Sequence, residues 1–468
     1  MKTNRIVLGL AVFILFFSSC KKDVIEEQSQ SQLSASDAMS SNHKLIVVVK
    51  DGFKMDDVTK AMTSVQGRSL ITKEILSQMG IMIVNSSDAT LADRLRKLPG
   101  VEAVASDVKM KLLPSVPFER LNKTKNTSKS IVAKNRFSYL QWALDAVHVK
   151  GAWNKDYEGK NAVVAVLDGG FYTHDPDIAP NVIAKQSFVE GEPVEFKGEG
   201  FSHGTHVAGI IAAADNDIGV IGVAPKAKLM LVKVLGDDGF GSWSSIIEGI
   251  YYAAMHGANV INMSLGGYLS KDENKELVTA LNKATRFAHL LGVTVIAAAG
   301  NDAVNFDKVR GFSHYPAACQ FVLSIAANGP KNWAYNPNTN LYKPAVYSNY
   351  GKNFVSLGAP GGNLIPPLDY SIVIVGNVIA PAYAFDMVLS NGFYDKTYGY
   401  GVGWAAGTSQ AAPYASGIAA LLYGKYKGIP FAPLVEYVLT ETATVRAQAA
   451  YFGKGEVNGA SALRYKFF

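Results

Sequence analysis

Cysteine is scarce in this chain of 468 residues, which contains only Cys20 and Cys319. Two cysteines exclude a disulfide-rich scaffold and a zinc module built on several thiolates. A strong excess of one charge is also missing, because 45 Lys and Arg residues stand against 39 Asp and Glu residues, for a net charge of +6. This mild balance gives no sign of a nucleic-acid partner, and we expect none.

The apolar run near the N-terminus is too short to span a membrane. It covers residues 6–17, twelve in all, whereas a helix needs about 20 to cross a bilayer. Lys2 and Arg5 precede the run and small residues follow it, which is the pattern of a secretory signal over residues 1–19. Residues 20–42 are polar and rich in Ser and Gln, which predicts a flexible tether.

The end of this signal, Phe-Ser-Ser-Cys at residues 17–20, resembles a bacterial lipobox in which Phe replaces the usual Leu. The resemblance implies that Cys20 is lipidated and anchors an exported protein to the cell envelope. The alternative is a plain signal with an incidental cysteine, which would give an extracellular protein. Contact with a membrane is expected through the lipid alone. Cys319 would have no partner, and we expect it to be buried as a small apolar residue.

The length exceeds what one core usually holds, so we expect at least two domains. Residues 45–50, 80–84 and 101–108 are apolar runs that predict strands, and residues 55–65 and 91–98 have helical spacing. Together they predict a small α+β unit over residues 43–112. Residues 113–136 carry many Lys, Arg, Asn, Thr and Ser residues, and we interpret them as an exposed linker open to proteolysis.

Residues 137–468 alternate between apolar strands and helical stretches. This alternation predicts an α/β fold with a parallel sheet covered by helices on both faces. The predicted strands are 162–167, 229–234, 258–263, 293–299 and 321–326, and the predicted helices are 204–214, 244–256, 274–291 and 409–423. Functional side chains of such sheets gather at the carboxyl ends of the strands.

Four residues carry reactive groups at the ends of these elements, namely Asp168, His203, Asn301 and Ser409. A Ser hydroxyl becomes a good nucleophile when a His takes its proton, and a buried Asp holds that His in the correct tautomer. The first N–H groups of a helix and an Asn amide can stabilise an oxyanion. These residue types indicate nucleophilic acyl transfer.

Three segments resemble the subtilisin-like serine proteases, or subtilases. They read HGTHVAG at residues 203–209, AAGN at 298–301 and GTSQAAP at 407–413, and the order Asp, His, Ser is also that of the family. The resemblance covers roughly residues 137–468 and implies a serine endopeptidase of subtilisin-like fold without a catalytic cofactor. It assigns Asp168, His203 and Ser409 to the triad and Asn301 to the oxyanion.

The same resemblance implies an extended polypeptide as substrate. A family strand that pairs with the substrate backbone matches Ser264, Leu265 and Gly266. A family wall of the pocket for the side chain before the scissile bond, the S1 pocket, matches Ala298, Ala299 and Gly300. His314 could lie at the floor of this pocket or in a surface loop.

The leading unit, residues 43–112, resembles the ferredoxin-like inhibitory and chaperone prodomain of this family. The resemblance implies a self-processing zymogen, cleaved between about residues 109 and 137, with its own prodomain as a partner. We expect the enzyme to be a monomer.

A calcium loop of the family matches residues 214–220, with Asp177 as a distant carboxylate, so we expect Asp177 and Asn216 to hold a structural Ca²⁺. A polar turn without metal is the alternative. His206 has no third ligand nearby in sequence and is expected to be structural. An apparent insertion at residues 364–400 could shape the substrate site or be inert.

Gly169 departs from the family pattern, in which a residue with a side chain usually follows the catalytic Asp. A hydrogen bond to Asp168 could therefore be missing, with a less securely held His203. For this reason a second reading stays open, a catalytically impaired surface lipoprotein that binds peptides in the same groove.

Overall fold

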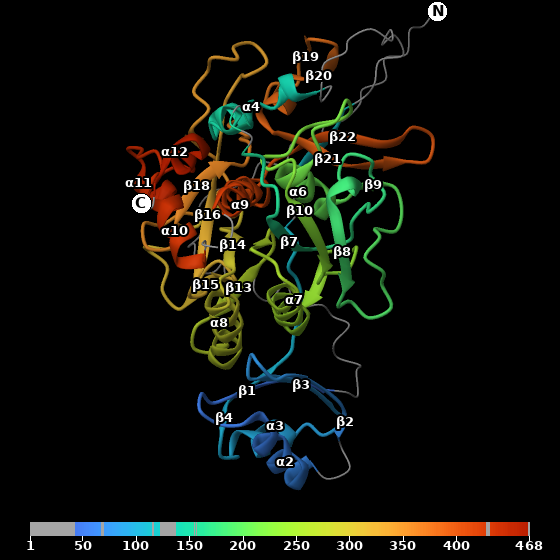
Figure 1. Ribbon diagram of the computed structural model, residues 1–468, viewed down its shortest axis with the longest axis vertical. Coiled ribbons are helices and arrows are strands. Elements are labelled where there is room, and N and C mark those ends of the chain that lie inside the picture. The colour runs from blue at the N-terminus through green and yellow to red at the C-terminus, as the bar shows by residue number, and fades with distance from the viewer. Residues whose placement is uncertain are drawn as a thin grey trace, which may run out of the picture.

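The structure, a computed structural model, describes residues 43–66, 70–114, 117–121, 137–153, 155, 157–426 and 431–466. The expected signal, Cys20 with its tether, and most of the expected linker lie outside the described residues. Figure 1 shows a small unit at one end of the long axis and a large unit above it. Within the described ranges, no helix has both the length and the apolar character needed to cross a membrane.

The small unit is a four-stranded antiparallel sheet with two helices on one face, as Figure 1 shows. In chain order its elements are β1 (His43–Val49), α2 (Met55–Gln66), β2 (Leu70–Leu76), β3 (Ile81–Ser86), α3 (Leu91–Arg96) and β4 (Val101–Ser106), and the strand order is β2-β3-β1-β4. Leu45 and Val47 pack with the helices, whereas Ile46 and Val48 between them pack toward the large unit. The predicted α+β unit is present, and β2 is an additional strand.

The large unit is built on a mostly parallel sheet, which confirms the predicted α/β fold. Its strand order is β17-β16-β14-β12-β7-β10-β8, with β18 also beside β16, and only β17 runs antiparallel. In chain order these strands are β7 (Val163–Asp168), β8 (Val182–Ser187), β10 (Lys228–Lys233), β12 (Val260–Met263), β14 (Thr294–Ala298), β16 (Val322–Gly329), β17 (Lys343–Pro344) and β18 (Leu357–Pro360).

Helices cover both faces of this sheet. The principal ones are α6 (His203–Ala212), α7 (Trp243–Met255), α8 (Lys275–Leu290) and α9 (Thr408–Lys425). Val164 and Val166 of β7 belong to the core that contains α6 and α9, whereas Ala165 and Leu167 belong to the core that contains α7 and α8. The strands are therefore apolar on both sides because both sides are buried.

Short elements complete the large unit. They are η2 (Ser138–Leu140), α4 (Trp142–Ala146), α5 (Lys150–Trp153), η3 (Ala179–Asn181), β13 (Gly267–Ser270), β15 (Phe312–Tyr315), α10 (Ala432–Glu441), α11 (Ala449–Phe452) and α12 (Gly459–Arg464). Cys319 is buried, as predicted, and forms no disulfide within the part of the chain that the structure describes.

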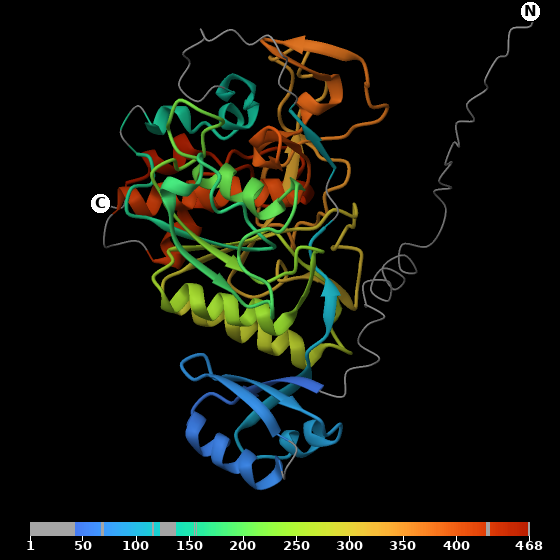
Figure 2. The ribbon, with the colours of Figure 1, turned by 90° about the vertical axis from the view of Figure 1, so that its right-hand side faces the viewer.

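The small unit rests on α7 and α8, as Figure 2 shows. Charged side chains bridge the junction. The Arg96 guanidinium lies 2.7 Å from the Glu276 carboxylate, and Lys283 and Arg286 lie 2.7 and 2.9 Å from Asp51. Most of these side chains are partly exposed.

The chain leaves the small unit along one side of the large unit (Figure 2). It forms β5 (Lys109–Lys111), which pairs with β11 (Phe240–Ser242), and then β6 (Phe118–Arg120). β6 is the edge of a sheet of order β6-β22-β21-β9, whose other strands are β9 (Gly200–Phe201), β21 (Val388–Asp395) and β22 (Gly399–Ala405). Within the predicted exposed linker of residues 113–136, residues 118–120 therefore form a strand on the free edge of β22. Phe118 is exposed, as expected of the linker, whereas Leu121 is buried.

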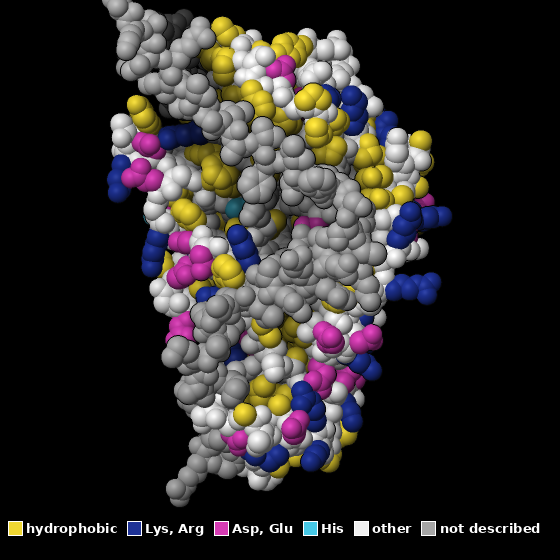
Figure 3. Space-filling model, turned by 180° about the vertical axis from the view of Figure 1, so that it is seen from behind, with side chains coloured by type: hydrophobic (Ala, Val, Ile, Leu, Met, Phe, Trp, Pro, Cys, Tyr) yellow, Lys and Arg dark blue, Asp and Glu magenta, His cyan; other side chains and the backbone are white. Residues whose placement is uncertain are grey.

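The apparent insertion at residues 364–400 forms ordered structure at the far end of the large unit. It contains β19 (Ile372–Val375), β20 (Val378–Pro381) and η4 (Ala382–Asp386), followed by β21. Several of its apolar side chains are exposed, among them Tyr370, Ile372 and Ile374. Figure 3 shows hydrophobic side chains gathered toward this end, whereas charges of both signs are interspersed over the small unit.

Candidate active site

Asp168 and His203 meet at the carboxyl edge of the sheet. Asp168 is the last residue of β7, and His203 is the first residue of α6, whose start is capped by the Ser202 side chain. The His203 Nδ1 lies 2.9 and 3.1 Å from the two Asp168 carboxylate oxygens. Both side chains are buried, and the Nε2 of His203 has no hydrogen-bond partner among the described residues. The imidazole is thus oriented through one nitrogen and open at the other.

Gly169 departs from the family pattern and has no side chain to bond Asp168. Its backbone N–H donates to Asp168 Oδ1 over 2.8 Å instead. Both Asp168 carboxylate oxygens lie within 3.1 Å of His203 Nδ1, so the imidazole is oriented in this structure without a side chain at residue 169. The backbone supplies a hydrogen bond that a side chain was expected to give.

Ser409 lies in the first turn of α9, where backbone N–H groups have no partner within the helix. Its hydroxyl donates to the backbone carbonyl of Ser264 over 3.1 Å, and the Ser264 hydroxyl donates to the backbone carbonyl of Ser409 over 2.8 Å. Ser264 directly follows β12, so these two bonds fix the start of α9 against the sheet.

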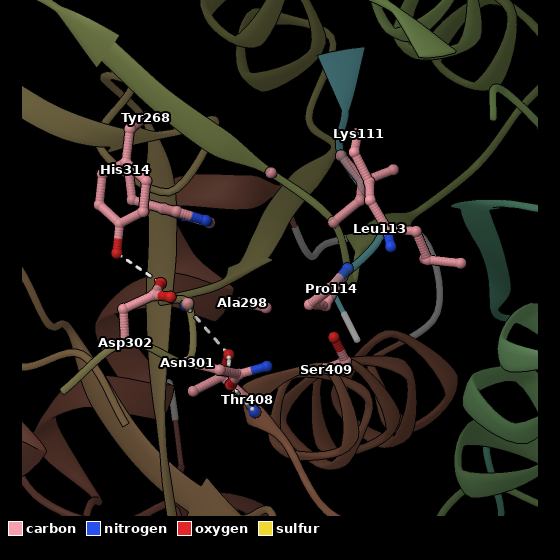
Figure 4. Close-up of a pocket in the computed structure, with 13 residues that line it drawn as sticks. Lys111, Leu113, Pro114, Tyr268, Ala298, Asn301, Asp302, His314, Thr408 and Ser409 are labelled. Atoms are coloured by element: carbon pink, nitrogen blue, oxygen red, sulfur yellow. Dashed lines mark hydrogen bonds between the residues drawn. The ribbon is translucent and has the colours of Figure 1, made fainter. Parts of the chain in front are cut away.

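Asn301 is oriented by the residue before the serine. Its side-chain oxygen accepts hydrogen bonds from the backbone N–H and the hydroxyl of Thr408, over 2.8 and 2.9 Å. With the oxygen held in this way, the amide nitrogen points into the pocket beside Ser409, as Figure 4 shows. The side chain is thus set to donate to a ligand in the pocket.

Ser409 and Asn301 open onto one cavity of about 230 Å³, shown in Figure 4. Of the predicted substrate-binding residues, Leu265, Gly266, Ala298 and Gly300 line it. Ala299 belongs instead to a small core cluster with Ala326 and Val355.

His314 lies in the wall of this cavity, where one of its two sequence interpretations put it. It fills the space between two glycines, since a Cβ added to Gly266 would meet its ring at 2.5 Å and one added to Gly300 would meet it at 3.0 Å. Burial lowers the pKa of His314 to about 4, so the ring is neutral at physiological pH. An uncharged side chain therefore narrows the pocket.

Residues 109–114 of the same chain occupy the cleft. Leu113 N donates to the carbonyl of Gly239 over 3.1 Å on one side, and Gly266 N donates to the carbonyl of Leu112 over 2.8 Å on the other. Pro114 follows beside Ser409 (Figure 4). Leu113 and Pro114 also line the neighbouring cavity that contains His203. The segment therefore passes through the site between residues 239–242 on one side and residues 264–266 on the other.

Asp177 and Asn216 also lie together, away from the cleft. A hydrogen bond from the Asn216 side chain reaches Asp177, whose Oδ2 also accepts from Val220 N over 2.9 Å. The Oδ1 of Asp177 is buried and has no partner among the described residues. Among all the residues that the structure describes, no group of three or more His, Cys, Asp or Glu side chains could hold a metal ion.

Other residues of the site were not anticipated. Tyr268 and Asp302 line the cavity near His314, and the Tyr268 hydroxyl donates to Asp302 over 2.5 Å. Each follows a recognised segment by only a few residues, which is the one sequence signal that could have found them. His206, in contrast, is buried with Nε2 3.3 Å from the Gly403 carbonyl, in keeping with a structural role.

Comparison with known proteins agrees with this geometry. The profile of the subtilase family matches residues 159–458. Subtilisin NAT from Bacillus subtilis subsp. natto is 33% identical over 435 residues, which cover 92% of this chain and 93% of that protein. Subtilisin Savinase from Lederbergia lenta is 35% identical over 325 residues, covering 69% of this chain and 99% of that protein.

The crystal structure of an epidermin leader peptide processing serine protease from Staphylococcus aureus has the same fold. It superposes with a TM-score of 0.68 at 21% identity, covering 92% of this chain and all of that one. The family match, the identity to subtilisins and the shared fold lead to one conclusion: the chain belongs to the subtilase family and is a subtilisin-like serine endopeptidase.

Proposed function

We propose that Asp168, His203 and Ser409 act together to hydrolyse peptide bonds through an acyl-enzyme. Ser409 attacks the scissile carbonyl while His203 Nε2 takes its proton and then passes it to the leaving amine, and water repeats the sequence on the acyl-enzyme. The observation that carries this proposal is the His203 ring, which is held by Asp168 through Nδ1 and open at Nε2.

Two donors would stabilise the oxyanion of each tetrahedral intermediate. The Asn301 amide nitrogen points into the pocket, and the backbone N–H of Ser409 lies in the first turn of α9. Both would be in place before the charge develops, which is the arrangement that lowers the barrier most.

Binding of a substrate would also free the nucleophile. In this structure the Ser409 hydroxyl donates to the carbonyl of Ser264. A substrate residue with a backbone N–H at the position of Pro114 could donate to that carbonyl instead, and the serine could then turn to His203.

Residues 43–112 would then act as the prodomain of a zymogen. The supporting observation is the segment of residues 109–113, which lies in the cleft with backbone hydrogen bonds on both sides, as an extended substrate would. Cleavage is expected between residues 109 and 137.

The test is self-processing. Wild-type protein should separate into two fragments on a gel, and N-terminal sequencing should locate the cut. Ser409→Ala should stay full length. Equal processing of both proteins would show that another protease makes the cut.

The pocket that His314 narrows would favour a small residue before the scissile bond, in line with Pro114 lying at its mouth. The substrate would be an extended, unfolded stretch of polypeptide, because both of its edges must pair with the cleft.

Export would follow from the signal at residues 1–19, and lipidation of Cys20 would keep the zymogen at the cell envelope. Cleavage downstream of residue 109 would then release the peptidase unit from its anchor. Radiolabelled palmitate should label wild type and leave Cys20→Ala unlabelled, and both should be exported.

Asp177 and Asn216 would hold a structural Ca²⁺ rather than a catalytic one. The buried, unpartnered Oδ1 of Asp177 fits a hard cation, which binds oxygen donors of this kind. A bound ion stabilises the folded state alone and so raises the unfolding temperature. Calcium should therefore raise the Tm of Ser409→Ala protein, and this rise should vanish in the further variant Asp177→Ala.

A further inference from the structure

The free edge of β22 receives the chain immediately after the segment in the cleft. Ala406 N donates to the Pro117 carbonyl and Leu121 N donates to the Val402 carbonyl, both over 3.1 Å. Between these bonds, β6 pairs antiparallel with β22. The pairing begins three residues before Ser409, so this edge leads directly away from the nucleophile.

The chain direction matches that of a substrate. Residues 109–114 approach Ser409 between two strands, and residues 117–121 leave it along β22. A peptide with its scissile bond at Ser409 would therefore lay its residues after that bond, the primed residues, where β6 lies now.

The first side chain of β6, Phe118, contacts an aromatic recess formed by the rings of Phe201 and Phe393. The ring of Phe118 stacks on Phe201 with centroids 4.8 Å apart and an interplanar angle of 13°. It also lies 5.9 Å from the ring of Phe393. Phe201 precedes His203 by two residues, so the recess adjoins the catalytic imidazole.

Polar partners contact the next two side chains, Glu119 and Arg120. The Arg120 guanidinium lies 3.1 Å from Asp395 and 5.9 Å from the centre of the Tyr398 ring. Glu119, which points to the opposite face of the strand, accepts a hydrogen bond from the Tyr383 hydroxyl over 3.1 Å. Tyr383, Asp395 and Tyr398 all lie within residues 364–400, so the apparent insertion supplies these contacts.

We propose that this edge is a primed-side recognition surface for extended peptides that carry an aromatic, an acidic and a basic residue in succession. It consists of the β22 backbone with Phe201, Tyr383, Phe393, Asp395 and Tyr398. Residues 118–120 are its occupant in the zymogen. Backbone pairing gives affinity for any extended chain, and the side-chain contacts select the sequence. The inference rests on the proposed proteolytic function.

The contacts suit an exchangeable occupant better than a permanent strand. Phe118 is 53% exposed, and the Arg120 and Asp395 side chains are 30% and 25% exposed. Such contacts at a surface are individually weak and can be replaced by those of another peptide.

The test begins with N-terminal sequencing of the processed wild-type enzyme. A mature chain that starts at residue 115 or 116 is the product of a cut at Ser409 with residues 118–120 on the primed side. A first cut after residue 121 would show that residues 118–120 do not lie on the primed side of the cleaved bond, and this result overturns the proposal.

Internally quenched peptides that copy residues 109–122 are then compared with copies in which residues 118–120 are three alanines. The native copy should have a kcat/KM about tenfold higher, from one aromatic stack and two charged contacts. Asp395→Ala enzyme should lose most of the difference between peptides with Arg and with Ala at position 120. The neighbouring variant Lys396→Ala, whose side chain is 80% exposed, should keep it. Equal kcat/KM for the two peptides overturns the proposal.

A peptide that copies residues 109–117 alone distinguishes a failure of recognition by β22 from a failure of the proposed proteolytic function. If the enzyme cleaves this peptide but shows no sequence preference downstream, recognition by β22 fails and proteolysis stands. If no peptide is cleaved, the proposed function fails. Fluorescence polarisation of a labelled peptide of residues 115–122 then decides whether the edge binds the native sequence more tightly than its alanine copy, and equal binding overturns the proposal.

Discussion

The N-terminal part of the chain touches the peptidase unit in two regions of different chemistry. In the cleft, residues 109–113 are held by backbone hydrogen bonds to the segments at 239–242 and 264–266. At α7 and α8, the small unit packs the apolar face of its sheet against the two helices, and side-chain ion pairs add to this contact. The first contact is open to any extended chain, whereas the second depends on these particular residues, on pH and on salt.

The largest effect is expected in the cleft. Asn301→Ala should lower kcat by about 10²–10³ and leave KM nearly unchanged, the range known for removing one oxyanion donor from subtilisin. The loss arises because the amide contacts the substrate oxygen chiefly when that oxygen carries negative charge. Steady-state kinetics on a peptide substrate measures it. A rise in KM with kcat unchanged would place Asn301 in binding alone.

The next effect concerns the shape of the cleft. His314→Gly should raise kcat/KM by at least about tenfold for peptides with Phe or Leu before the scissile bond, because it opens the space between Gly266 and Gly300. Peptides with Ala at that position serve as the control and should change little. If bulky residues gained nothing, His314 would not limit the pocket.

The junction at α7 should respond to pH instead. Burial and a hydrogen bond with Glu74 raise the pKa of Glu248 to about 9 in the joined protein, from an ordinary value of 4.5. The joined state therefore binds a proton more tightly than the separated state, so binding should weaken as the pH rises between these two values, by at most about tenfold per pH unit.

Surface plasmon resonance measures this dependence. The small unit, kept after processing, is passed over the immobilised peptidase unit. Glu248→Gln should remove most of the pH dependence of binding between the two pKa values of Glu248. A wild-type profile that is already flat would show that Glu248 does not titrate at the junction.

The smallest effect is expected from the exposed ion pairs. Asp51→Asn should weaken binding of the small unit by about two- to fivefold, because exposed pairs contribute roughly 0.2–1 kcal/mol each. Added salt should weaken wild type toward the variant. A loss above about a hundredfold would show that Asp51 does more than pair with Lys283 and Arg286 at the surface.

The difference between contacts that depend on local sequence and contacts that depend on a distant partner explains which elements could be predicted. Runs apolar on both faces predicted strands such as β7 and β14 within one or two residues, because burial on both sides leaves an unambiguous pattern. The four motif residues could be placed at the carboxyl edge of the sheet because each ends a strand or begins a helix. Local chemistry was sufficient there.

Strands whose pairing is decided by a distant partner escaped prediction. β6 lies in a polar stretch and forms because β22, some 280 residues away in sequence, offers an unpaired edge. β2 is interrupted by Lys73 and Glu74, which hide its alternation. The hydrogen bond from Gly169 N to Asp168 is a backbone contact, which residue identity cannot reveal.

The most direct test of the account is fluorophosphonate labelling of processed enzyme, with the labelled peptide mapped by mass spectrometry. We expect a single label on Ser409 in wild type and almost none in His203→Ala, because the hydroxyl reacts only when the imidazole takes its proton. Equal labelling of the two proteins, or a label on another residue, would contradict the assignment of Asp168, His203 and Ser409 as one catalytic unit.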